Sequence, residues 1–383
     1  MSYLFTCCQI GAEKFLKHEL SELAPQAHFA FSRPGFVTFK FPEDRPATDR
    51  VGSQFDVGSA KTNSFGSITS STRPCGFAPE EGVPKSIFAR ASGVSLERLT
   101  GDETQRIEKI VKELEDGDYQ AFHVWSRDEK PSGKSGYEVG PTEEDDRVAN
   151  LVRSALPSSV RNRLLINEPV VKGDRVLDCT IVDPDVWMTG FHRATFTATC
   201  YPGGMINLVM PPEVVSRAWY KMEEALIWSG LPLEPGARVA ELGSSPGGAT
   251  QALLSRGCQV LGVDPAEMAP IVLANPNFRH LRGRTTELPK KEFRKIRWLA
   301  SDMNVAPNYT LDAVEDIVMN KQVSIRGLIL TLKLVEWDLA WNIPQYLERI
   351  RSWGFNVIKA RQLQHNRQEI CVAALQTPFR RKS

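Results

Sequence analysis

Apolar and polar positions follow two different patterns in the two halves of the chain. From residue 208 onward, short apolar runs of strand length are separated by stretches in which apolar residues recur with helical spacing. The predicted strands lie at residues 238–242, 259–263, 278–282, 298–301, 327–333, 356–360 and 370–376. Strands that alternate with helices in this way predict an α/β fold, with a mostly parallel sheet and helices on both faces.

The first 207 residues show the mixed pattern of an α+β structure. A strand, an amphipathic helix and two more strands are predicted within residues 2–41, and a long loop rich in Ser, Gly, Thr and Pro at 42–76. Further predictions are helices at 103–114 and 147–156, strands at 119–125, 175–182, 186–191 and 194–200, and a mobile loop at 128–145. The length and these patterns predict three units, at residues 1–84, 85–207 and 208–383.

The turn after the first strand of the third unit carries the clearest chemical pattern. It reads LGSSPGG at 242–248, and the next strand is followed by Asp264. Glycines let a ligand approach the backbone, and an acid at the tip of the second strand accepts hydrogen bonds from ribose hydroxyls. The turn has neither a G-x-G-x-x-G pattern nor a P-loop lysine, so a nucleoside without phosphates, such as S-adenosylmethionine, is favoured. An ordinary strand-to-helix turn is the alternative interpretation.

Composition excludes several classes of protein. The 383 residues are 42% hydrophobic and 24% charged, as is usual for globular proteins in water, and no apolar run is long enough to span a bilayer. We expect no signal peptide, because the first residues lack a basic segment followed by an apolar one. Seven scattered cysteines without a C-x-x-C pair favour reduced thiols in the cytoplasm over disulfides or a zinc site.

The net charge of +1 conceals two basic segments. Residues 279–297 contain eight Lys or Arg and two Glu, and residues 349–383 contain eight Lys or Arg and one Glu. Such segments are suited to binding nucleic-acid phosphates, and a solvated charged surface is the alternative. Aromatic residues that are candidates for stacking on exposed bases, with helix packing as the alternative, are Trp219, Tyr220, Trp337 and Trp341.

Four charged residues of the third unit are candidates for catalysis. Asp302 follows a predicted strand and Glu369 precedes another. Lys333 lies inside the apolar run GLILTLKL, and Lys221 lies on the helix that leads into the sheet. Burial of an ammonium group is costly, and desolvation or a second cation lowers the pKa of a lysine, which makes it a usable base near neutral pH. A lysine at a strand end that reaches water with its amine is the alternative interpretation of Lys333.

Five motifs together resemble those of the FtsJ-type RNA ribose 2′-O-methyltransferases. They are SRAWYK at 216–221, LGSSPGG at 242–248, SDM at 301–303, LKL at 332–334 and ARQLQHNRQEI at 360–370. The resemblance is closest to the RlmM branch, which 2′-O-methylates a cytidine of bacterial 23S ribosomal RNA. It implies a Rossmann-like domain that uses S-adenosyl-L-methionine at 208–383, preceded by a ferredoxin-like unit at 1–84 and a THUMP-like RNA-binding domain at 85–207.

The resemblance also implies roles for individual residues. The family's Lys-Asp-Lys-Glu tetrad falls on Lys221, Asp302, Lys333 and Glu369, and its cofactor residues fall on Ser216, Gly243, Ser245, Pro246, Gly247, Gly248, Asp264 and Asp302. Neutral Lys333 is expected to take the proton of the ribose 2′-hydroxyl during its attack on the sulfonium methyl group. Lys221 would stabilise the oxyanion and the carboxylates would hold the amines, so no metal is needed.

The chain departs from the family at one site, and several functions stay open. Where the family has an acid that contacts adenine, this chain has Arg284, with Glu287 three residues on. We expect a cytoplasmic monomer that binds RNA, most of all ribosomal RNA before full subunit assembly, and no membrane. The alternatives are a tRNA or mRNA-cap methyltransferase, a non-catalytic RNA-binding or ribosome-assembly protein with a retained methyltransferase fold, and a small-molecule O-methyltransferase.

Overall fold

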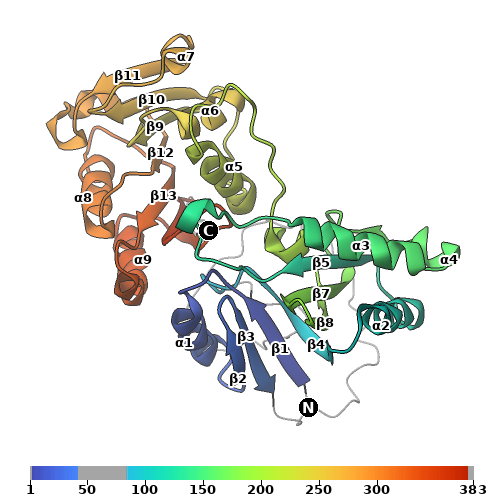
Figure 1. Cartoon of the computed structure of the whole chain (residues 1–383). Coiled ribbons are helices and arrows are strands. Elements are labelled where there is room, and N and C mark those ends of the chain that lie inside the picture. The colour runs from blue at the N-terminus through green and yellow to red at the C-terminus, as the bar shows by residue number, and fades with distance from the viewer. Residues whose placement is uncertain (1, 42–82, 84, 378–383) are drawn as a thin grey trace, which may run out of the picture.

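The described residues of the chain form two β-sheets with helices packed against them (Figure 1). The computed structural model describes residues 2–41, 83 and 85–377. The predicted loop at 42–76 and the basic residues at the end of the chain, 378–383, lie outside this description. Within the described parts, no helix has the length and apolar character to cross a membrane.

The first sheet has eight strands in the order β2-β3-β1-β4-β8-β7-β5-β6. The strands are β1 (Ser2–Cys7), β2 (His28–Arg33), β3 (Phe36–Phe41), β4 (Ala91–Leu99), β5 (Ala121–Ser126), β6 (Leu165–Ile166), β7 (Arg175–Asp183) and β8 (Val186–Arg193), and the helices are α1 (Glu13–Leu23), α2 (Glu103–Asp116), α3 (Glu143–Ala155) and α4 (Ser158–Arg161). β4 pairs antiparallel with β1, so the sheet continues across the predicted boundary between residues 84 and 85.

The helices of this part form where apolar residues recur with helical spacing and a suitable residue caps the helix end. α1 buries Phe15, Leu16 and Leu20, which recur with helical spacing. α2 begins after Asp102, whose side chain accepts a hydrogen bond from the backbone N–H of Gln105 at 2.8 Å. Removal of such a cap costs a helix about 1 kcal/mol.

The structure differs from two predictions for this region. The segment 194–200 is a turn containing a 3₁₀ helix (Thr197–Cys200), because Thr199 Oγ1 accepts hydrogen bonds from the backbone N–H groups of Thr195 and Phe196. The segment 128–145, expected to be a mobile loop, has several fixed contacts. Asp128 is buried in an ion pair with Arg90, and the end of the segment already belongs to α3.

The second sheet has seven strands in the order β11-β10-β9-β12-β13-β15-β14. The strands are β9 (Arg238–Leu242), β10 (Gln259–Asp264), β11 (Phe278–Arg282), β12 (Trp298–Ser301), β13 (Gly327–Lys333), β14 (Val357–Arg361) and β15 (Glu369–Leu375), and the helices are α5 (Ala218–Ser229), α6 (Gly248–Ser255), α7 (Pro270–Leu273), α8 (Pro307–Val318) and α9 (Ile343–Ser352). Within the described residues β15 runs opposite to the other six strands of this sheet, and the remaining pairs are parallel, which confirms the predicted mostly parallel sheet.

Chain order along this sheet reverses at β9. β10 and β11 follow on one side of β9, and β12 and β13 on the other. Helices α5 and α6 contribute to the apolar cluster on one face, and α8 and α9 to the cluster on the other. In open α/β sheets, ligands bind beyond the carboxyl ends of the strands at such a reversal. The topology therefore points to the ends of β9 and β12 as the position of a site.

The two sheets share buried apolar surface. One hydrophobic cluster contains residues of α1, such as Phe15 and Leu16, together with residues of the second sheet and α9. The ring centroid of Phe15 lies 5.8 Å from that of Trp337 and 4.8 Å from that of Trp341. These two tryptophans join the halves of the chain, which favours the packing alternative over base stacking.

Candidate active site

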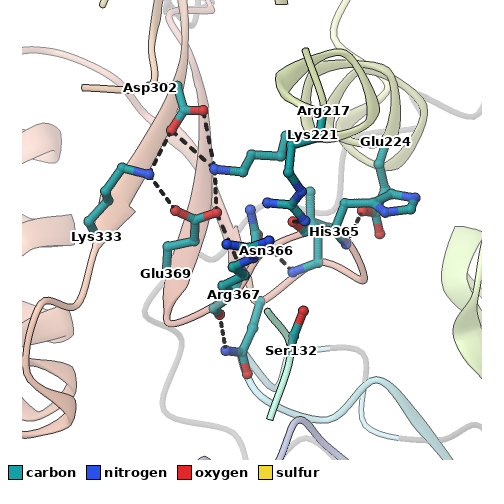
Figure 2. A network of polar contacts seen from close by, with 12 residues as sticks. Ser132, Arg217, Lys221, Glu224, Asp302, Lys333, His365, Asn366, Arg367 and Glu369 are labelled. Carbon is teal, nitrogen blue, oxygen red and sulfur yellow. Dashed lines mark hydrogen bonds and ion pairs between the residues drawn. The ribbon is translucent and has the colours of Figure 1, made fainter. Parts of the chain in front are cut away.

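Four charged side chains from distant parts of the chain meet at the carboxyl edge of the second sheet. Lys221 comes from α5, Asp302 follows β12, Lys333 ends β13 and Glu369 begins β15 (Figure 2). β13 and β15 pair with Lys333 opposite Glu369, so strand register alone brings these two residues together. The structure thus unites the four residues predicted as the tetrad.

Each amine of this tetrad bridges both carboxylates. Lys221 Nζ lies 2.6 Å from Glu369 Oε1 and 3.2 Å from Asp302 Oδ2. Lys333 Nζ lies 2.7 Å from Glu369 Oε2 and 3.2 Å from Asp302 Oδ1. All four side chains are at most 18% exposed, so these ion pairs are only weakly screened by water. The alternation of charges fixes two amines side by side at one point of the sheet edge.

The prediction of a neutral Lys333 is wrong for the described structure, because of the charges around it. Burial alone would lower the pKa of Lys333, but the nearby Asp302 and Glu369 carboxylates outweigh it and raise the pKa above the ordinary value of 10.5. Burial would likewise raise the pKa of Glu369, but Lys221 and Lys333 lower it to about 2. In the described state Lys333 is therefore an ammonium group at neutral pH.

A cavity of about 440 Å³ opens beside the tetrad at the reversal point of the sheet. Four of the predicted cofactor residues line it, namely Gly243, Ser245, Asp264 and Asp302. Asp264 is held in place because its carboxylate accepts hydrogen bonds from the backbone N–H groups of Ser245 and Ala266. Gly243 has φ +79°, and a Cβ atom there would lie 3.0 Å from Met303 Cγ. The turn is therefore shaped for close approach to the backbone.

The other predicted cofactor residues do not line the cavity. Those residues are Ser216, Pro246, Gly247 and Gly248. A Cβ atom at Gly248 would lie 2.2 Å from Ser216 Oγ, and one at Gly247 would lie 2.7 Å from Val272 Cγ2. The two glycines thus allow Ser216, just ahead of α5, and Val272 of α7 to pack closely against the turn. Ser216 Oγ is buried without a hydrogen-bond partner among the described residues.

Comparisons with known proteins agree with this geometry. The model of the FtsJ-like methyltransferase family matches residues 214–370. Ribosomal RNA large subunit methyltransferase M of Xanthomonas campestris pv. campestris (strain B100) is 30% identical over 303 residues, which cover 76% of this chain and 82% of that protein. The chain belongs to this methyltransferase M family. Membership confirms the family predicted from the motifs and, with it, a methyltransferase that uses S-adenosyl-L-methionine.

Other similarities are weaker. The protein of the same name from Xanthomonas oryzae pv. oryzae (strain PXO99A) is 29% identical over 303 residues, covering 76% of this chain and 82% of its own. The solved structure of the Methanococcus jannaschii fibrillarin pre-rRNA processing protein covers 55% of this chain and 96% of its own, with 12% identity and a TM-score of 0.34.

The cavity also contains residues that the motifs did not indicate. Thr285, Thr286 and Tyr309 line it together with Arg284, the residue at the family's acidic position. Tyr309 is 68% exposed, and no pattern in the sequence distinguishes it from other helical tyrosines. Among residues 2–41, 83 and 85–377, no group of three or more His, Cys, Asp or Glu is arranged to hold a metal ion.

The loop that ends in Glu369 is held from both halves of the chain. Glu224, one turn after Lys221 on α5, accepts hydrogen bonds from the backbone N–H groups of Gln364 at 2.7 Å and His365 at 2.9 Å. Burial raises the pKa of Glu224 to about 7. From the N-terminal half, Gln9, which follows β1, donates through Nε2 to the carbonyl oxygen of Leu363 at 3.1 Å. These contacts fix the loop between β14 and β15, and with it the position of the Glu369 carboxylate.

The basic segment 279–297 does not lie along one path to the tetrad. Arg284 lines the cavity, but Arg279, Arg294 and Lys295 line a separate hollow together with Arg238, the first residue of β9. That hollow is at the amino edge of the sheet, opposite the tetrad. The second half of the segment therefore lies apart from the tetrad, because the chain crosses the sheet between β11 and β12.

Proposed function

We propose that this protein transfers the methyl group of S-adenosyl-L-methionine to the 2′-hydroxyl of a ribose in large-subunit ribosomal RNA, most specifically a cytidine of 23S RNA. The observation that carries the proposal is the closed arrangement of two amines and two carboxylates beside a nucleoside-sized cavity. Asp302 belongs to both the tetrad and the cavity lining. The relatives at 29–30% identity carry the name of a large-subunit ribosomal RNA methyltransferase.

The cavity residues fit the cofactor chemically. Asp264 would accept hydrogen bonds from the ribose hydroxyls, and the backbone at Gly243 and Ser245 would lie along the methionine part. Arg284 and Tyr309 would border the adenine ring, in place of the acid usual in the family. The cofactor, when bound, supplies an electrophilic methyl group on a sulfonium centre, and its positive charge would lie next to the Asp302 carboxylate.

The tetrad would then prepare the acceptor hydroxyl. Lys333 must first release its proton, because the ammonium form cannot act as a base. A second positive charge close to the amines opposes their protonated form and lowers their pKa. Lys333 Nζ would then take the 2′-hydroxyl proton, while Lys221 stabilises the negative charge that develops on the oxygen. Glu369 stays ionised throughout and keeps both amines in place.

The N-terminal half has a surface suited to RNA. Phe29 and Phe31 on the edge strand β2 are 53% and 42% exposed. Lys17 Nζ lies 4.1 Å from the ring centroid of Phe29, and the guanidinium of Arg33 lies 4.8 Å from that of Phe31. Exposed aromatic rings with adjacent cations bind the bases and phosphates of single-stranded RNA. We therefore assign residues 1–207 to ferredoxin-like and THUMP-like RNA binding, in a cytoplasmic monomer that acts before subunit assembly is complete.

Transfer of labelled methyl to ribosomal RNA by the full-length protein tests the proposal. Lys333→Met should abolish transfer and leave cofactor affinity within about twofold, because the amine acts on the acceptor. Lys321→Met, an exposed lysine ahead of β13, is the matched control and should transfer at the wild-type rate. A wild-type protein that binds ribosomal RNA without transferring methyl would instead support the non-catalytic alternative.

A further inference from the structure

One carboxylate from the N-terminal half binds two arginines that flank the tetrad. Glu138 Oε2 accepts a hydrogen bond from Arg217 at 2.7 Å, and Glu138 Oε1 accepts one from Arg367. Ser132 Oγ donates to the same carboxylate at 3.2 Å. The side chains of Arg217 and Arg367 are 33% and 44% exposed, so an anion from solution can reach them. The residues of this cluster take no part in the methyl transfer proposed above.

The two arginines are placed by the same elements as the catalytic groups. Arg217 is the N-cap of α5 and precedes Lys221 by four residues, which puts both on one face of the helix. Arg367 precedes Glu369 by two residues, and its backbone N–H donates to Glu369 Oε1 at 3.4 Å. Figure 2 shows Arg217 and Lys221 on the same helix and Arg367 beside Glu369. The arginine pair therefore borders the position where the acceptor ribose must lie.

The Glu138 carboxylate has the charge and shape of an RNA linkage. A carboxylate and a phosphodiester each carry one negative charge on two equivalent oxygens, and guanidinium groups bind both through paired N–H groups. In RNA, the carbon that carries the 2′-hydroxyl is bonded to the carbon that carries the 3′-phosphate. A site that holds the hydroxyl at Lys333 and Lys221 therefore has a phosphate as its immediate neighbour.

We infer that Arg217 and Arg367 form the subsite for the backbone phosphate next to the acceptor ribose, and that Glu138 occupies this subsite until RNA displaces it. The inference rests on the proposed function, because it takes the tetrad as the position of the acceptor. The segment that carries Glu138 also covers Arg367 closely. A Cβ atom at Gly133, which has φ +85°, would lie 2.5 Å from Arg367 Nε. Displacement of Glu138 would thus uncover the guanidinium.

The affinity of the protein for RNA tests the inference. If Glu138 occupies the phosphate subsite, its removal should strengthen RNA binding, whereas if Glu138 only clamps the two halves together, its removal should weaken RNA binding. We would measure binding of a fluorescein-labelled oligocytidine RNA to the full-length protein by anisotropy at several salt concentrations. Glu138→Gln should bind about fivefold more tightly, since it removes two partly exposed ion pairs that compete with the phosphate. The dependence of log K on log salt should become steeper in this variant, because the arginines then release solution anions.

The arginine variants should show the reverse. Arg217→Ala and Arg367→Ala should each weaken binding and reduce the salt dependence. Glu292→Gln is the matched control, because Glu292 also pairs with an arginine, Arg279, but at the amino edge of the second sheet, opposite the tetrad. It should bind RNA as the wild type does.

Two outcomes would overturn the inference. One is unchanged or weaker RNA binding by Glu138→Gln together with a lower unfolding midpoint, which would mark Glu138 as a clamp between the two halves. The other is equal binding by the arginine variants and the wild type. Failure of the proposed function can be distinguished from failure of this inference, because the RNA affinities of the variants are compared without methyl transfer. A protein that transfers methyl to RNA but shows either outcome would refute the phosphate subsite alone.

Discussion

Replacement of Glu369 by glutamine should destabilise the protein by an amount that depends on pH in a defined way. The folded protein lowers the pKa of Glu369 from 4.5 to about 2, chiefly through Lys221 and Lys333 acting against burial. At 1.36 kcal/mol per pH unit, this shift corresponds to about 3 kcal/mol of interaction with the charged carboxylate. Glu369→Gln should therefore lower the free energy of unfolding by about 3 kcal/mol near pH 7.

The sign of the pH dependence follows from linkage. A carboxyl group whose pKa is lowered by folding stabilises the protein above its unfolded pKa of 4.5, and this stabilisation is lost as the pH falls toward 2. Near pH 3.5 about 1 kcal/mol is already lost in the wild type, so the difference from Glu369→Gln should shrink to about 2 kcal/mol.

Urea unfolding followed by circular dichroism, at about pH 7 and about pH 3.5, measures both quantities. Glu336→Gln is the control, because Glu336 is exposed and lies near the same edge of the sheet. It should change the unfolding free energy by less than about 0.5 kcal/mol. A Glu369→Gln effect below about 1 kcal/mol near pH 7, or one of the same size at both pH values, would refute the assigned electrostatics.

Three further predictions concern the reaction and the cofactor cavity. The kcat/KM of methyl transfer should rise with pH above neutrality, because Lys333 is protonated there and its pKa is raised; a flat profile between about pH 7 and about pH 9 would contradict its role as the base. Asp264→Ala should weaken cofactor binding about tenfold or more, and unchanged affinity by calorimetry would exclude Asp264 from the site. Gly243→Ala should weaken it too, through contact with Met303, whereas Gly236→Ala, at a similar positive φ but in open space, should bind as the wild type does.

The secondary structure of the second sheet followed from local pattern. Apolar runs at strand length and the glycine turn after β9 are local signals, and their order along the chain is sufficient to predict a mostly parallel sheet. The antiparallel placement of β15 is not local, because it depends on which sheet edge the last strand reaches. Likewise, the pairing of β1 with β4 joins strands separated by a long segment, and periodicity alone gave no sign of a shared sheet.

The tetrad could be predicted because its motifs occur in a fixed order, but its charge state could not. Reasoning from a lysine in an apolar strand predicted a lowered pKa for Lys333. That pKa depends on two carboxylates at 2.7 and 3.2 Å, which are known only from the fold. Glu138 was missed for a related reason. Its partners Arg217 and Arg367 are far away in sequence, and a glutamate in a polar Gly/Pro-bearing segment indicates only a loop.

A map of ribose 2′-O-methylation across total RNA tests the central claim most directly. Cells that carry the wild-type gene would be compared with cells in which the gene encodes Lys333→Met at equal protein level. The account predicts that one methylated cytidine of large-subunit ribosomal RNA is lost in the Lys333→Met cells while all other sites are unchanged. Full methylation of every large-subunit site in those cells would contradict it.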